Sequence, residues 1–101
     1  MLIKIFVRTF PSTEDCELFE SILETRWPNL LQKVKGVRFR AMKNPQTPNV
    51  SVVLWEFPDN ESMKKIEKLI EENIAKYVKT LAPKTVHFVG AVTQDFGETS
   101  F

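Results

Sequence analysis

Few side chains in this sequence could do acid–base or nucleophilic chemistry. His87 is the one histidine, and it is the only side chain that titrates near neutral pH without perturbation. No Gly-x-Ser-x-Gly segment is present, and nothing places a serine or Cys16 beside His87 as a nucleophile. One cysteine, one histidine and three glycines exclude a structural zinc site and a phosphate-binding loop. If the protein is a catalyst, we therefore expect His87 to act without a metal or a cofactor.

Four basic side chains form the most informative group in the sequence. Lys4 and Arg8 alternate with Phe6 along one segment, and Arg38 and Arg40 alternate along another. In β-strands each set would share one face, and we expect both sets on the sheet face that carries no helices. Cations around an aromatic ring can bind an anion or a nucleic acid strand, although edge charges and ion pairs across a dimer interface give the same pattern. We predict Arg8, Arg38 and Arg40 as ligand-binding residues.

Length and composition limit the protein to one ordinary globular domain. The chain has 101 residues, of which 43% are hydrophobic and 27% charged, and its net charge is +1. No excess of charge points to nucleic acid or membrane. The apolar run Leu2–Val7 contains Lys4 and is too short for a signal or membrane segment. Because a single cysteine cannot form an internal disulfide, we expect a reducing, cytoplasmic location.

Hydrophobic periodicity divides the chain into strands with period two and helices with an apolar stripe. Proline-rich or polar segments separate these elements, and Pro28 is expected to end or restart the first helix near Trp27. The expected elements are a strand at 2–10, a helix from Ser12 or Thr13 to about Trp27, strands at 34–42 and 50–57, a helix from Asp59 to Pro83, and a strand at 85–93.

This order of elements predicts an α+β fold of the ferredoxin-like βαββαβ type. Two right-handed crossovers give a four-stranded antiparallel sheet with both helices on one face. We expect a single domain over residues 1–96 and a short C-terminal tail at 97–101. The other face of the sheet needs a cover or must tolerate water.

The stretch from Gly36 to Val89 resembles the dimeric α+β barrel superfamily, especially its antibiotic-biosynthesis-monooxygenase-like branch. The resemblance lies in the segment Val-Leu-Trp-Glu-Phe57, the acidic cap Pro58-Asp-Asn-Glu61, and the helix end Leu81-Ala-Pro83. It implies that two chains pack their sheets into a closed barrel. It also implies a pocket between the sheet and the helices of each protomer.

The same resemblance suggests which residues would form a site. The first strand has no Asn and the second helix no His, so the haem-degrading activity of some relatives is not expected. A cofactor-independent oxygenase must bind and deprotonate an electron-rich aromatic compound. Trp55, Phe57 and Tyr77 are side chains of the type that surrounds such a substrate, and His87 is the candidate general base. The same aromatic residues can equally be core packing.

A second resemblance is to RNA-recognition motifs. The hexamer Ile5-Phe-Val-Arg-Thr-Phe10 is similar to their first strand, with Phe6 at the stacking position. In the third strand, however, Val52 and Leu54 stand where two base-stacking aromatic rings are usual. A single-stranded RNA-binding module would use Phe6, Arg8, Arg38 and Arg40.

These patterns favour a homodimer formed through the sheet face, with an apolar centre and charged rims. Within it we expect a small aromatic or anionic ligand and no membrane, and we consider nucleic acid a weaker alternative. Small-molecule binding, cofactor-independent oxygenation of an aromatic compound, and a non-catalytic structural or ligand-sensing role all stay open.

Overall fold

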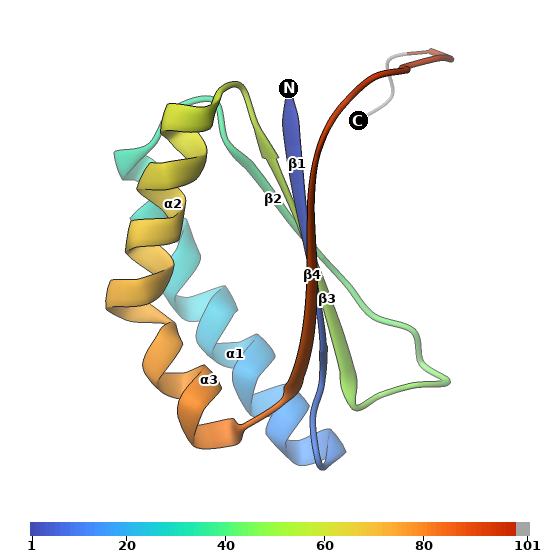
Figure 1. Ribbon diagram of the computed structural model, residues 1–101. Helices are drawn as coiled ribbons and strands as arrows, with labels where there is room; N and C mark the ends of the chain where they lie inside the picture. The colour runs from blue at the N-terminus through green and yellow to red at the C-terminus, as the bar shows by residue number, and fades with distance from the viewer. Residues whose placement is uncertain (99–101) are drawn as a thin grey trace.

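The protein folds as a four-stranded antiparallel sheet with every helix on one face (Figure 1), as described by a computed structural model over residues 1–98. The strand order is β2-β3-β1-β4. The predicted α+β, ferredoxin-like architecture is confirmed. The elements are β1 (Leu2–Thr9), α1 (Thr13–Leu30), the 3-10 turn η1 (Leu31–Lys33), β2 (Arg38–Met42), β3 (Val50–Phe57), α2 (Asn60–Asn73), α3 (Ala75–Leu81) and β4 (Lys84–Ala91). Residues 99–101 of the predicted tail lie outside the described residues.

Three boundaries differ clearly from the sequence-based expectation, and one of them is the strand expected at 34–42, which begins only at Arg38. The first helix continues through Pro28 to Leu30 instead of ending near Trp27, because a proline close to a helix end removes one hydrogen bond and leaves little helix beyond it. The second helix breaks at Ile74, where α2 gives way to α3. Ser12 and Asp59 accept hydrogen bonds at the N-termini of α1 and α2, as their types predict.

The orientation of β1 is the main departure from the expected fold. Lys4 and Arg8 point toward the helices, where Lys4 pairs with Glu67 of α2 and Arg8 lies over the ring of Phe19 on α1. The expectation that they share the free sheet face with Arg38 and Arg40 is wrong. In the β1–β3 register, Lys4 is opposite Trp55 and Arg8 is opposite Ser51, both buried. Since successive strand residues face opposite sides, Ile3, Ile5 and Val7 point outward.

Aromatic side chains dominate the core between sheet and helices. Trp55 packs edge-on against Trp27 at 4.6 Å and against Phe39 at 4.9 Å between ring centroids, and its ring lies parallel to that of Phe57 at 5.9 Å. Burying such rings contributes strongly to stability. These large side chains of β3 fix its inner face, and the pairing with β1 then fixes which side chains of β1 turn inward.

The free face of the sheet has an apolar centre with charged groups along one edge. Two rows cross it in register from β2 to β4. They run Arg40, Leu54, Ile5, Phe88 and Met42, Val52, Val7, Val86. Phe88 and Val86 are 67% and 65% exposed. Over residues 1–98 no further layer covers this face (Figure 1).

None of the helices within residues 1–98 has the length and apolar character needed to cross a membrane.

Candidate functional site

A cavity of about 410 Å³ lies between α1 and the edge strand β2, on the helix side of the sheet. Trp27 of α1 and Phe39 of β2 line it with their rings, which lie 6.1 Å apart between centroids. The remaining lining residues are mostly apolar, and they are Glu20, Leu23, Glu24, Pro28, Leu31 and Ala41. Its size and lining suit a small, mainly apolar ligand.

The cavity exists because α1 does not fully cover the edge strand. Ala41 of β2 contributes only a methyl group where a larger side chain would fill the space, and it is exposed. Trp27 and Leu23 are spaced four residues apart on α1 and so lie on one face of the helix. Trp27 and Leu23 therefore form the α1 side of the cavity, opposite Phe39 and Ala41 of β2.

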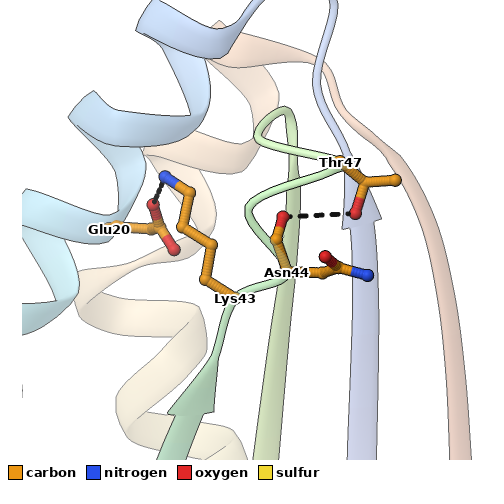
Figure 2. A network of polar contacts seen from close by, with 4 residues as sticks. All are labelled: Glu20, Lys43, Asn44 and Thr47. Atoms are coloured by element: carbon orange, nitrogen blue, oxygen red, sulfur yellow. Dashed lines mark hydrogen bonds and ion pairs between the residues drawn. The ribbon is translucent and has the colours of Figure 1, made fainter.

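A salt bridge ties the connection after β2 to α1 beside this cavity. Figure 2 shows Lys43 reaching Glu20, with Nζ 2.9 Å from Oε1. The hydrogen bond to Glu20 raises the pKa of Lys43. Asn44 begins the β2–β3 turn, where its carbonyl accepts from the Thr47 backbone N–H at 2.9 Å. The salt bridge thus joins the end of β2 to α1.

Arg8 lies at the inner side of this region with almost no solvent contact. Arg8 is 5% exposed. Its guanidinium carbon lies 4.3 Å from the ring centroid of Phe6 and 5.0 Å from that of Phe19. Within residues 1–98 its Nε has no hydrogen-bond partner. Burial lowers the pKa of Arg8 to about 10, which leaves it charged at neutral pH. Arg8 is thus a buried cation held by ring faces.

Lys4 shares the inner face of β1 but has a partner of opposite charge. Its Nζ lies 2.8 Å from Oε2 of Glu67 on α2. The ammonium also lies 5.0 Å from the ring centroid of Phe6. The fold therefore neutralises one of the two inward cations of β1 with a carboxylate.

The residues predicted around an aromatic substrate are not gathered in one place. Trp55 and Phe57 are fully buried core residues, and neither lines the 410 Å³ cavity. Tyr77 of α3 accepts a hydrogen bond from Arg26 of α1 through its hydroxyl group. His87 lies on the edge strand β4, exposed, with its ring 6.1 Å from that of Phe6.

The cavity residues Trp27 and Phe39 were not among the predicted site residues. Both carry a signal in the sequence: Trp27 continues the helical stripe through Leu23, and Phe39 alternates between Arg38 and Arg40. Neither signal separates a cavity wall from ordinary core packing. The two predicted arginines beside Phe39 point to the other face, where Arg40 pairs with Glu56 at 3.3 Å.

The placement of β1 removes the basis for the RNA-binding alternative. Stacking of bases needs Phe6 on an open sheet face beside the cations. Phe6 is instead half-buried between sheet and helices, in contact with Arg8. Only Arg38 and Arg40 of the proposed basic group lie on the free face, at its β2 edge.

Two other sequence candidates are placed by the fold. Cys16 is fully buried in α1, and burial raises the pKa of its thiol, which disfavours the reactive thiolate. Among residues 1–98, no three histidine, cysteine, aspartate or glutamate side chains are grouped so that they could hold a metal ion.

No family model matches the chain, and no curated protein matches it. Solved structures do. A dimeric ferredoxin-like protein from an uncultured marine organism is 23% identical with a TM-score of 0.74, covering 96% of this chain and 98% of its own. A "putative antibiotic biosynthesis monooxygenase" from Deinococcus radiodurans is 10% identical with a TM-score of 0.79, covering 99% and 100%. SnoaB, a cofactor-independent oxygenase from Streptomyces nogalater, is 15% identical with a TM-score of 0.68, covering 96% and 97%.

These similarities match the resemblance seen in the sequence. At such identities they establish the ferredoxin-like fold, which supports many functions. The function of this chain depends on its own residues.

The inward orientation of Lys4 makes a testable prediction about stability. Glu67→Ala is expected to lower the free energy of unfolding by about 1–3 kcal/mol, because it leaves a buried ammonium without its counter-charge. The control Glu61→Ala, on the same helix, breaks a pair with Lys65 whose side chains are well exposed and should cost under about 1 kcal/mol. Urea denaturation followed by tryptophan fluorescence measures both. Equal losses would contradict an interior Lys4.

Proposed function

We propose that this protein is a homodimer of the α+β barrel type that binds a small aromatic compound in the cavity between α1 and β2 of each protomer. The observation that carries the binding proposal is the 410 Å³ cavity with the rings of Trp27 and Phe39 in its wall. Aromatic rings recognise one another through offset and edge-on contacts. The volume falls within the range of known small-molecule pockets, about 300–1,000 Å³.

The free sheet face supports dimerisation through a second copy of the chain. Its centre is formed by Ile5, Val7, Val52 and Leu54, and the exposed Phe88 of the edge strand β4 extends this apolar surface. A contiguous apolar patch of this kind is rare on a monomer unless it is an interaction site. Two of the solved structures with this fold are described as dimeric ferredoxin-like proteins.

The charges on this face are arranged in a way compatible with such a dimer. Arg38 and Arg40 lie on the edge strand β2, and Arg40 pairs with Glu56. The central strand β1 sends Lys4 and Arg8 to the other side. A barrel formed by two copies would therefore bury an apolar centre and leave the cations at its rim, where they avoid the desolvation of a buried charge.

Cofactor-independent oxygenation of the bound aromatic compound is the second candidate function. The fold similarity to SnoaB favours it, and His87 is its general base in our proposal. However, β4 lies three strands from β2, roughly 14 Å at the usual strand spacing. A compound seated only beside β2 is beyond the reach of His87. Ligand binding is therefore the primary proposed function, and it agrees with a ligand-sensing role. Catalysis by His87 requires a substrate that also extends toward Phe6.

The dimer makes a prediction about solution mass. Light scattering on a sizing column should give 23.4 kDa, twice the chain mass of 11.7 kDa. Phe88→Glu, on the edge strand β4 of the free face, should shift the protein toward 11.7 kDa because it places a charge in the interface. Leu18→Glu, at an exposed apolar position on α1, is the matched control and should stay dimeric. A wild-type mass of 11.7 kDa at tens of micromolar would overturn the dimer.

The cavity makes a prediction about ligand binding. Calorimetric titration with naphthalene derivatives should detect binding, and Ala41→Trp should weaken it at least tenfold because the new ring occupies the cavity. Ala91→Trp serves as the control, since Ala91 is also an exposed alanine on the helix side of an edge strand, but on β4. Unchanged affinity in Ala41→Trp would remove this cavity from the binding function.

The oxygenase candidate has its own test. Oxygen consumption is measured with dihydroxynaphthalenes as substrates, in the wild type and in His87→Ala. Catalysis by His87 predicts turnover that falls at least a hundredfold in the variant while calorimetric affinity is retained. Turnover that survives in His87→Ala would remove His87 from the mechanism, and no turnover in the wild type would leave binding as the function.

A further inference from the structure

We propose that the aromatic ligand carries an oxyanion, a carboxylate or phenolate, which binds Arg8 and Ser51 on the inner face of the sheet beside the cavity. This inference rests on the proposed binding function and specifies the chemical class of its ligand. It is carried by two buried residues opposite each other on neighbouring strands, whose Arg8 Nε and Ser51 Oγ have no hydrogen-bond partner within residues 1–98.

Arg8 is in a costly position for a protein without a ligand. A buried cation normally has a carboxylate or several hydrogen-bond acceptors around it. Lys4, two residues earlier on the same face of β1, has Glu67. Arg8 has the rings of Phe6 and Phe19, and its Nε is unpartnered within the described part of the chain. The five N–H donors of a guanidinium bind an oxyanion more strongly than they bind a neutral acceptor.

Ser51 supplies a second unsatisfied group at the same place. It is directly opposite Arg8 in the β1–β3 register and is fully buried. Its Oγ also lacks a hydrogen-bond partner among residues 1–98. Directly opposed residues on one face of an antiparallel pair have Cβ atoms about 4.5–5.5 Å apart. The Ser51 hydroxyl and the Arg8 side chain thus lie on neighbouring strands of the same sheet face, and an oxygen acceptor placed between them would satisfy both.

A small void beside Arg8 shares part of its wall with the larger cavity. The void has a volume of about 10 Å³, and Arg8 forms part of its wall. It shares the side chains of Leu23, Trp27 and Phe39 with the 410 Å³ cavity. This space admits a group about the size of one water molecule, so it accommodates a ligand oxygen and excludes a ring. The ring would stay in the larger cavity, against the rings of Trp27 and Phe39.

The test compares two ligands that differ mainly in charge, 1-naphthoate and 1-naphthamide, by calorimetric titration of the full chain. The wild type should bind the acid at least about tenfold more tightly than the amide, since the anion gains charge-assisted hydrogen bonds. Arg8→Met should remove this preference while amide affinity stays within about threefold. Lys64→Met, which removes one cation from the exposed side of α2, should keep it.

Stability of the ligand-free protein separates a binding role from a structural one. Arg8→Met should unfold at the same or a higher urea concentration than the wild type, because it removes a buried charge that forms no ion pair within residues 1–98. If Arg8→Met does not fold, Ser51→Ala tests the same proposal. That variant should lose several-fold in affinity for 1-naphthoate and little for 1-naphthamide.

The outcomes distinguish this inference from the proposal on which it rests. Equal binding of acid and amide by the wild type would overturn the oxyanion and leave aromatic binding intact. An acid preference that survives in both Arg8→Met and Ser51→Ala would also overturn it. If neither ligand binds, the aromatic-binding function itself fails, and the oxyanion fails with it.

Discussion

The alternation of side chains along β1 is the constraint on which the rest of this structure depends. Lys4, Phe6 and Arg8 point toward the helices, and the alternate residues Ile3, Ile5 and Val7 point to the outer face. The cause lies in β3, whose Trp55 and Phe57 must be buried against α1 and β2. Once β3 is oriented, antiparallel pairing decides the face of every residue on β1, because a slip of one residue would exchange all of them.

This orientation has opposite consequences for the two faces of the sheet. The outer face gains an apolar centre that a monomer would expose to water, which favours association with a second copy. The inner face gains two cations that must be desolvated. Glu67 compensates Lys4, whereas Arg8 relies on aromatic rings. A group kept in an unfavourable state within the fold is a recognised mark of a functional site.

The sequence predicts the architecture well because hydrophobic periodicity and caps act locally. Ser12 and Asp59 begin their helices as expected, and the order of strands and helices follows. It does not predict the orientation of β1. The alternation of Ile3, Ile5 and Val7 with charged residues normally places the apolar set inside a monomer. Here a non-local interaction, pairing with the aromatic strand β3, reverses that preference.

The candidate site is less predictable for the same reason. Arg8 is among the predicted ligand-binding residues, but its place beside Ser51 arises from pairing between strands about forty residues apart. The cavity depends on Ala41 being too small to fill the edge under α1, and on Trp27 and Phe39 at its wall. Residue types alone do not reveal such a gap, since the same aromatic spacing would serve a filled core.

The most direct test of this account is a nuclear Overhauser measurement on the isotopically labelled protein. If β1 has the orientation described, side-chain protons of Arg8 give cross-peaks to the ring protons of Phe19, which lies 5.0 Å from the guanidinium carbon, and the methyl groups of Val7 give none. Cross-peaks from Val7 to Phe19, with Arg8 showing none, would place the cations on the outer face. They would contradict both the apolar dimer face and the interior oxyanion site.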